Sequence, residues 1–313
     1  MFDAKFYDTL SRLQLQMSHK SSLNMSGNRK SVQKGFSAEF SDFREYMPGD
    51  DLRRMDWNVY ARLDKLYVRE YMEEKEAIVS VLIDTSASMD YGAKSKAELA
   101  RDLAAVVSFL ALNNMDRVFL YDMKDMGRGL SVGGGRNAFA KVLRWLEKLA
   151  FSGEVDMLSA AKKMQRHGPG VTVLISDFLH RDMLDEDETE PGRKSFADTE
   201  SMSDKGSRGD CYEKLLQYLD FCKQRPIVLH TMAEEELRVT LEGAVNLIDS
   251  ETESKLRLTV DARAIRNYER ELSRLTERMK KGCAAGRGAY VLCDTGRDRN
   301  QLVFQDLRVI YDI

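Results

Sequence analysis

Three polar side chains at alternate positions form the sharpest candidate for chemistry in this sequence. Asp84, Ser86 and Ser88 follow directly after the apolar run 77–83. One carboxylate and two hydroxyls are hard oxygen ligands, which suit Mg²⁺ or Mn²⁺. A second acid, Asp177, comes at the end of a later apolar run. Asp and Ser are also common in turns and helix caps, so the pattern predicts either a metal site of these four residues or an ordinary loop.

The segments that must position these residues alternate between strand-like and helix-like patterns. Nearly unbroken apolar runs predict buried strands, and apolar residues at helical spacing predict helices between them. The predicted strands are 77–84, 116–121, 171–176, 227–232 and 289–293, and the predicted helices are 94–113, 137–149, 156–166, 212–224 and 262–281. Strands separated by helices predict a doubly wound, mostly parallel α/β sheet. Ligands of such sheets bind beyond the carboxyl ends of the strands, so Asp84 and Asp177 are expected at one edge.

Other segments fall outside this alternation. Residues 1–25 predict an N-terminal helix and a connector. Residues 26–76 and 239–260, the second with the pattern of a hairpin, are expected to form one small β subdomain. The α/β domain is then 77–238 plus 261–313. Within it, residues 182–210 carry ten acids and four bases with almost no large apolar residue, which predicts a disordered acidic insert.

Composition excludes several classes of protein. The 313 residues carry a net charge of −3, whereas a dedicated nucleic-acid binder would be basic. No apolar run approaches the roughly 18 residues of a membrane-spanning helix, and the acid-containing start does not resemble a secretory signal. The four cysteines show no CxxC spacing, so we expect no zinc site. These features predict a cytoplasmic protein without a membrane span.

The residues around the candidate site resemble a known motif and a known family. Asp84-Thr85-Ser86-Ala87-Ser88 resembles the D-x-S-x-S metal-ion-dependent adhesion motif (MIDAS) of von Willebrand factor A domains. The DUF58 family signature is similar to Ser176-Asp177-Phe178, to residues 247–252, and to Glu39-Phe40, Arg44-Glu45-Tyr46, Pro48-Gly49-Asp50-Asp51, Arg53, Asp56-Trp57 and Ala61-Arg62. Over roughly 26–307, the resemblance implies a von Willebrand A-like fold without known catalytic activity. It further implies a bacterial partner or adaptor of a MoxR-type AAA+ ATPase that assembles or remodels other proteins.

One position departs from the motif that this resemblance implies. The A-domain metal site takes a threonine from a G-G-T-D-like stretch, and the corresponding residues here are Gly153-Glu154-Val155-Asp156. Val155 stands where the threonine is expected, and valine offers no oxygen. The site therefore either holds Mg²⁺ or Mn²⁺ through Asp84, Ser86, Ser88 and Asp177 with extra water, or uses Asp156, or is weak or empty.

A mixed-charge stretch before the first predicted buried strand is a second candidate region. Acidic and basic residues alternate between Asp50 and Arg62. One interpretation is a salt-bridged network that fixes the β subdomain against the sheet domain. The other is a docking surface for a partner, formed by Arg53, Asp56, Trp57 and Arg62, because arginine binds carboxylates bidentately and tryptophan anchors interfaces.

The sequence favours one function over two others. In the favoured one, a non-enzymatic interaction module, a metal on Asp84, Ser86 and Ser88 leaves a coordination position for an acidic residue of a partner or client protein. The alternative is a scaffold whose metal site is vestigial. The third is a magnesium-dependent phosphotransferase or hydrolase, since Asp84 resembles the nucleophile of haloacid-dehalogenase-like enzymes. That chemistry needs a general acid at the position of Ser86, and serine is a poor proton donor near neutral pH.

Overall fold

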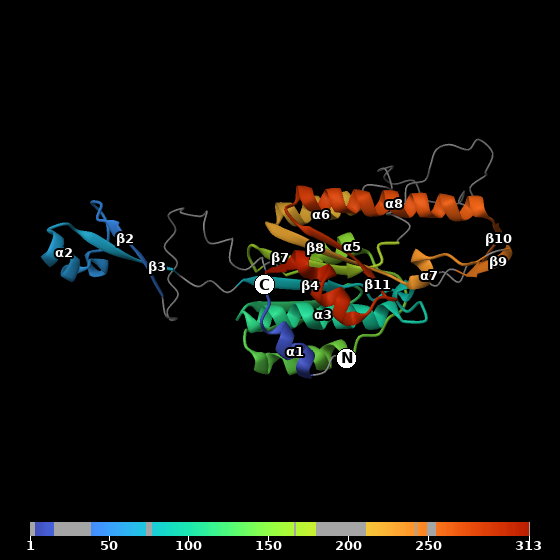
Figure 1. Cartoon of the computed structure of the whole chain (residues 1–313), viewed down its shortest axis with the longest axis horizontal. Coiled ribbons are helices and arrows are strands. Elements are labelled where there is room, and N and C mark those ends of the chain that lie inside the picture. Colours follow the sequence, from blue (N-terminus) through green and yellow to red (C-terminus); the bar gives the residue numbers. More distant parts are fainter. Residues whose placement is uncertain are drawn as a thin grey trace. The chain divides into compact units, whose positions relative to one another are not determined.

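The apolar runs of the sequence form a six-stranded sheet (Figure 1). The structure is a computed structural model, and it describes residues 4–15, 39–72, 77–165, 167–179, 211–241, 243–248 and 255–312. The strands are β4 (Ile78–Ile83), β5 (Arg117–Asp122), β6 (Leu130–Val132), β7 (Gly170–Ser176), β8 (Gln224–Met232) and β11 (Ala289–Asp294). Their order is β11-β8-β7-β4-β5-β6, and only the β5–β6 pair is antiparallel. This arrangement confirms the predicted doubly wound, mostly parallel α/β fold.

The path of the chain creates a switch point at the centre of the sheet. From β4 the chain moves outward through β5 to β6, and it then returns to place β7 on the other side of β4. Ile83 at the end of β4 pairs with Asp122 of β5 and with Ile175 of β7. The residues that follow these three strands therefore share one edge, where doubly wound folds place their ligands.

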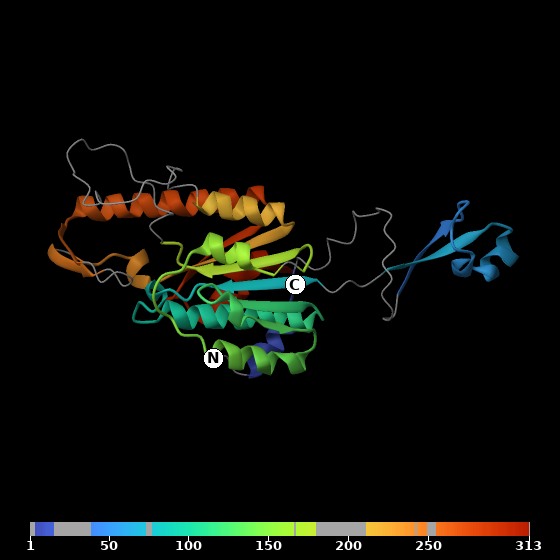
Figure 2. The ribbon, with the colours of Figure 1, turned by 180° about the vertical axis from the view of Figure 1, so that it is seen from behind.

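Helices cover both faces of the sheet (Figures 1 and 2). One layer contains α1 (Ala4–Leu10), α3 (Lys96–Asn113), α4 (Phe139–Leu146) and α9 (Arg299–Phe304). The other contains α5 (Met157–Lys163), α6 (Cys211–Phe221) and α8 (Ala262–Ala285). Short 3-10 turns lie at η2 (Ala87–Met89), η3 (Met126–Arg128), η4 (Arg136–Ala138) and η7 (Asp306–Ile310).

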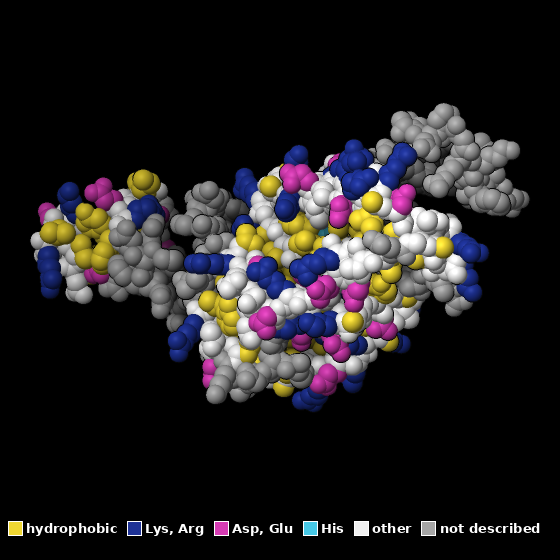
Figure 3. Space-filling model, turned by 45° about the vertical axis from the view of Figure 1, so that its right-hand side comes forward, with side chains coloured by type: hydrophobic (Ala, Val, Ile, Leu, Met, Phe, Trp, Pro, Cys, Tyr) yellow, Lys and Arg dark blue, Asp and Glu magenta, His cyan; other side chains and the backbone are white. Residues whose placement is uncertain are grey.

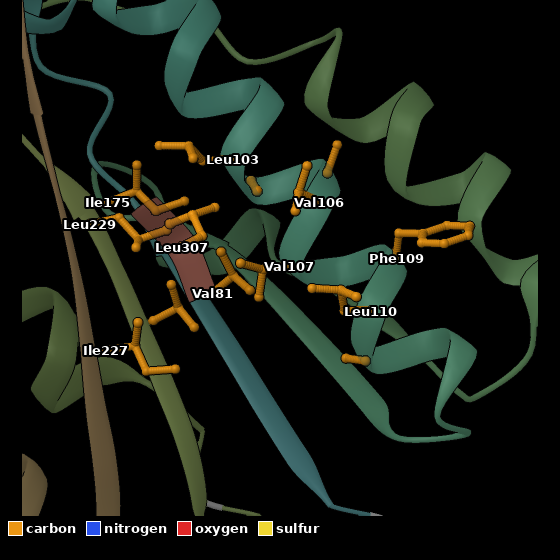
Figure 4. Packing of buried hydrophobic residues seen from close by; sticks show 14 of the residues in the cluster. Val81, Leu103, Val106, Val107, Phe109, Leu110, Ile175, Ile227, Leu229 and Leu307 are labelled. Carbon is orange, nitrogen blue, oxygen red and sulfur yellow. The ribbon is translucent and has the colours of Figure 1, made fainter. Parts of the chain in front are cut away.

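Alternate residues of the central strands enter two separate cores, because successive side chains of a strand point to opposite faces. Val81 and Ile83 of β4 lie in the cluster under α3, whereas Leu82 lies in the cluster under α5, α6 and α8. Figure 4 shows the first cluster, in which Leu103 and Val107 of α3 face the sheet. The predicted apolar stripe of this helix is therefore its buried face.

The N-terminal segment contains the predicted helix, α1, and its first 18 residues belong to the larger unit. The chain divides into one unit of residues 1–18 and 77–313 and a second of residues 19–76. Phe6 and Leu10 of α1 are buried in the core that includes α3. In addition, β1 (Gln14–Leu15) pairs antiparallel with β12 (Tyr311–Asp312), so both ends of the chain are joined.

The late hairpin also belongs to the larger unit, and this corrects its predicted grouping with residues 26–76. Strands β9 (Gly243–Ile248) and β10 (Lys255–Val260) pair antiparallel as the sequence predicted. The hairpin follows the short helix α7 (Glu234–Leu237), and β10 leads directly into α8, which it contacts. Asp261 caps α8 by accepting from the Ala264 N–H. The short link to α8 ties the hairpin to that helix.

The smaller unit is built around an antiparallel pair, β2 (Glu39–Glu45) and β3 (Tyr67–Met72). The connection between them contains the 3-10 turn η1 (Leu52–Arg54) and the helix α2 (Trp57–Leu63). Met55 and Val68 are buried within it. The predicted acidic insert, residues 182–210, lies outside the described residues. None of the helices in the described ranges is both long and apolar enough to cross a bilayer.

Candidate functional site

Asp84 organises the loop after β4 at the switch point. Its backbone N–H donates to the Ile175 carbonyl of β7. Its Oδ1 accepts from the Ser86 N–H at 2.9 Å, and its Oδ2 accepts from the Ser176 hydroxyl at 2.5 Å. Asp84, Ser86 and Ser176 are all fully buried. The carboxylate therefore joins the ends of the two central strands.

The two serines of the predicted motif lie together in this loop. The hydroxyl oxygens of Ser86 and Ser88 are 3.0 Å apart, and Ser88 is half-buried. The neighbouring loop holds them in place, because the Ala87 N–H donates to the Gly153 carbonyl and the Ser152 N–H donates to the Thr85 carbonyl. The structure thus brings together three of the four predicted metal ligands, Asp84, Ser86 and Ser88.

A third aspartate at the same edge, Asp122, is not among the site residues predicted from the sequence. The Thr85 hydroxyl donates to Oδ1 of Asp122 at 2.5 Å, and the Lys124 N–H donates to the same oxygen. Asp122 is the last residue of β5, directly beside β4. Its position at the end of a predicted parallel strand was the available signal, the same one that drew attention to Asp84.

Asp177, the fourth predicted ligand, is paired with a lysine. Lys96 Nζ lies 2.8 Å from Asp177 Oδ2 and 2.7 Å from Glu236 Oε1. The side chains of Lys96 and Asp177 are each only 1% exposed. Burial lowers the pKa of Lys96, but the two carboxylates outweigh that effect and hold it above its ordinary value. The ammonium is therefore charged, and it neutralises the carboxylate that the sequence assigned to a metal.

Neither Val155 nor Asp156 supplies a ligand in this arrangement. Val155 is buried in the apolar cluster under α5 and α6. Asp156 is the N-cap of α5, where it accepts from both the N–H and the hydroxyl of Ser159. The sequence left open that Asp156 replaces the missing threonine as a ligand. In the structure its carboxylate caps the N-terminus of α5 instead.

The residues present do not fit the predicted four-ligand metal site. Asp177 faces a buried ammonium, and a divalent cation beside it would meet a like charge. Asp84 is the remaining carboxylate of the set, and both of its oxygens accept hydrogen bonds from this loop and β7. The buried carboxylates of Asp84 and Asp177 are thus paired with hydrogen-bond donors and an ammonium of the chain itself.

A buried histidine lies behind this edge. His230 of β8 is fully buried, and its Nδ1 lies 2.7 Å from the Tyr290 hydroxyl of β11. The pKa of His230 is lowered to about 4, chiefly by burial and to a lesser extent by the charge of Lys96, while the charge and backbone of Asp177 oppose this shift. His230 is therefore neutral in the folded protein at neutral pH.

The neutral state of His230 predicts a pH-dependent loss of stability. In the unfolded chain its pKa returns to about 6.5, so the unfolded state binds more protons between that pH and about 4. This contribution is fully present above about pH 6.5, and we expect about 3 kcal/mol to be lost as the pH falls through that window. Urea unfolding at several pH values should show a shallower acid loss for His230→Asn than for the wild type. An equal loss of unfolding free energy with falling pH in the two proteins would contradict a neutral, buried His230.

The predicted partner-binding residues divide into structural and exposed groups. Asp56 is buried and caps α2 by accepting from the Asn58 and Val59 N–H groups. Trp57 is 62% exposed, and its ring meets that of Tyr60 edge to face at 6.3 Å. Arg53 and Arg62 are exposed, and neither has an ion pair within the described part of the chain.

The acids of the same stretch act locally. Asp50 pairs with Arg44 at 2.8 Å and also accepts from the Met47 N–H. The Arg44 hydrogen bond is the main reason that the pKa of Asp50 lies below its ordinary value. Asp51 caps η1 by accepting from the Arg53 N–H. These contacts shape the connection between β2 and β3 and leave Trp57, Arg53 and Arg62 at the surface.

The stretch from the small unit through the switch point matches one known family. Residues 42–197 fit the model of the family described as "Protein of unknown function DUF58". Residues 42–197 are a DUF58 segment. This confirms the predicted DUF58 resemblance over about half of the chain. The DUF58 segment contains Asp84, Lys96 and Asp177, whereas Glu236 lies beyond it.

Curated relatives of the chain are similar over a comparable length. An uncharacterized protein of Mycobacterium bovis, Mb1516, is 30% identical over 186 residues, which are 56% of this chain and 58% of the relative. An uncharacterized protein of Mycobacterium tuberculosis, Rv1480, shows the same values. The chain therefore matches little more than half of the length of these relatives.

Solved structures overlap with the chain at low similarity. The conserved hypothetical protein BatB from Bacteroides thetaiotaomicron gives a TM-score of 0.37 at 13% identity, covering 70% of this chain and 90% of that one. A von Willebrand factor type A structure from Catenulispora acidiphila gives 0.38 at 11% identity, covering 76% and 42%. At TM-scores this low, the fold class rests on the strand order of the sheet itself.

Proposed function

We propose that this chain is a non-enzymatic protein-interaction module that serves a MoxR-type AAA+ ATPase as partner or adaptor in assembling or remodelling other proteins. The DUF58 resemblance implies that role, and its confirmation over residues 42–197 supports the proposal. The observation that carries the interaction itself is an exposed apolar surface on the smaller unit.

This surface is formed by β2 and by the connection between β2 and β3. It contains six large hydrophobic side chains that are exposed: Phe43, Met47, Leu52, Trp57, Tyr60 and Leu63. Figure 3 shows hydrophobic side chains gathered on this unit. Soluble proteins rarely expose large apolar patches without a binding role. We call these six residues the apolar surface.

The chemistry of the apolar surface indicates the kind of partner. Tryptophan, tyrosine and arginine dominate the binding energy of protein interfaces. Trp57 and Tyr60 are in contact here, and the exposed Arg53 and Arg62 lie in the same segment. A partner with an apolar patch and flanking carboxylates would match this combination, since arginine binds carboxylates bidentately.

The candidate site supports binding or scaffolding rather than catalysis. Ser86 occupies the position at which an aspartate nucleophile would need a general acid, and its N–H and hydroxyl are used within the loop. Among the described hydrogen bonds of this edge, none joins a serine hydroxyl to a histidine, as nucleophilic catalysis by serine would need. We therefore propose that Asp84, Ser86 and Ser176 hold the ends of β4 and β7 in one fixed geometry.

The sequence favoured a metal-dependent interaction module, with a scaffold whose metal site is vestigial as the alternative; we propose instead an interaction module that needs no metal. A contact bridged by Mg²⁺ or Mn²⁺ requires carboxylates that are available to the ion. The pairing of Asp177 with Lys96 supports the metal-free form. Binding would then depend on the apolar surface and not on the loop after β4.

Trp57→Ala should weaken binding of a MoxR-type ATPase from the same organism by at least about tenfold, because removing a central aromatic anchor typically costs 2 kcal/mol or more. Isothermal titration calorimetry with the full chain measures the dissociation constant. Phe221→Ala is the matched control, since Phe221 is a similarly exposed aromatic side chain of the larger unit. EDTA should leave the dissociation constant unchanged.

The opposite pattern would relocate the contact. If Trp57→Ala bound as tightly as wild type while EDTA or Asp84→Ala abolished binding, the interaction would be the metal-dependent one at the loop after β4. If neither variant nor EDTA affected binding, the apolar surface would not be the interface.

A further inference from the structure

Lys96 occupies an unfavourable position for a cation unless something compensates it. It is the first residue of the 18-residue helix α3, after the N-cap Ser95. The N-terminus of a helix carries a partial positive charge, so an ammonium there is repelled by the helix dipole. Its burial adds a desolvation cost of several kcal/mol for an unpaired charge. A buried lysine at this position therefore requires negatively charged partners that compensate its charge.

Two carboxylates compensate the charge of Lys96, and both oxygens of each carboxylate have a partner. Asp177 Oδ2 and Glu236 Oε1 lie within 2.8 Å of Lys96 Nζ. The second oxygen of Asp177 accepts from the Leu179 N–H, and the second oxygen of Glu236 accepts from the Ala233 N–H. Buried ion pairs are retained when additional hydrogen bonds satisfy the remaining lone pairs, and this one meets that condition.

The ammonium joins three elements at the switch point. Lys96 begins α3, Asp177 follows β7, and Glu236 lies on α7. The residue before Asp177 is Ser176, whose hydroxyl donates to Asp84. Asp84 is therefore linked to Glu236 through Ser176, the adjacent Asp177 and Lys96. Lys96 is the positive charge in this series of contacts.

We propose that Lys96 is the resident cation of this edge: it provides from within the chain the positive charge that a divalent metal would provide at Asp177. The edge is thus independent of metal as folded. Removing the ammonium would leave two buried carboxylates facing one space. Carboxylate pairs of this kind bind Mg²⁺ or Mn²⁺, so the loss of Lys96 would create a metal site that the wild-type protein does not have.

Titration with Mn²⁺ followed by electron paramagnetic resonance tests this proposal, because bound Mn²⁺ loses the sharp signal of the free ion. The wild type should bind no Mn²⁺ that depends on Asp84 or Asp177. Lys96→Ala should bind Mn²⁺ at least about tenfold more tightly than the wild type, and the double variant Lys96→Ala/Asp177→Asn should lose that gain. Lys94→Ala is the matched control, because Lys94 lies in the same segment but is exposed. It should behave as wild type.

Two results would overturn the proposal. One is stoichiometric Mn²⁺ binding by the wild type that is lost in Asp177→Asn or Asp84→Asn. The other is a Lys96→Ala protein with wild-type circular dichroism that binds Mn²⁺ no more tightly than Lys94→Ala. If Lys96→Ala does not fold, the wild-type titration alone decides. Since no partner protein is present, the outcome is separate from that of the ATPase-binding experiment.

Discussion

Lys96→Met is expected to lower the free energy of unfolding of the larger unit by about 3–5 kcal/mol in buffer containing EDTA, the usual cost of removing one partner from a buried ion pair. The substitution keeps most of the side-chain length but leaves Asp177 and Glu236 without their shared counter-charge. Asp177 is almost completely buried, so water cannot replace the ammonium without opening the edge of the sheet.

Urea unfolding measured by tryptophan fluorescence isolates this effect. The chain has two tryptophans, Trp57 in the smaller unit and Trp145 in the larger one. In a Trp57→Phe background the signal reports Trp145 alone, whose indole N–H donates to the Arg128 carbonyl. Lys94→Met is the control, and it should change the free energy of unfolding by less than about 1 kcal/mol because Lys94 is exposed.

A second measurement separates lost charge pairing from lost packing. Asp177→Asn added to Lys96→Met removes one of the stranded carboxylates, so the double variant should be more stable than Lys96→Met alone. A loss for Lys96→Met no larger than that for Lys94→Met would show that the ion pair contributes nothing to stability. A double variant that is less stable than Lys96→Met would show that packing is responsible.

Leu110→Ala should lower the free energy of unfolding by about 2–5 kcal/mol, the range for leucine truncation in a packed core. Leu110 is completely buried on α3, in the cluster that also contains Val107 of the same helix and Val81 of β4 (Figure 4). The shortened side chain leaves a cavity under the helix that carries Lys96 at its first position.

Leu241→Ala provides the matched control, because Leu241 is about half exposed. Its expected loss is within about 0.5 kcal/mol, as for most surface substitutions. Both variants are compared by the same fluorescence-detected urea unfolding. Equal losses for Leu110→Ala and Leu241→Ala would contradict the packing of α3 on the sheet.

Local patterns were sufficient to predict the five parallel strands of the sheet and the loop of Asp84, but not the short antiparallel edge strand β6. The run before Asp84 has to be buried on both faces, and the stripe of Leu103 and Val107 has to face a core. Because parallel strands end at a common edge, the placement of Asp84 and Asp177 also followed from the order of elements. The apolar pattern is a property of neighbouring residues, and a sequence displays it directly.

Pairings between distant segments were not predictable in the same way. Lys96 lies three residues before Leu99 and seven before Leu103, so it falls on the buried stripe of α3, and that was a usable signal of a buried charge. Its partners, however, are 81 and 140 residues away along the chain. Similarly, the late hairpin was predicted, but not its membership in the larger unit.

The sequence by itself determined the α/β fold, the DUF58 resemblance and the close grouping of Asp84, Ser86 and Ser88, because each depends on residues near one another in the chain. Only the tertiary structure decided what Asp177 does. The fold brings the first turn of α3, the end of β7 and α7 together, and a buried carboxylate binds the nearest cation that the chain itself delivers.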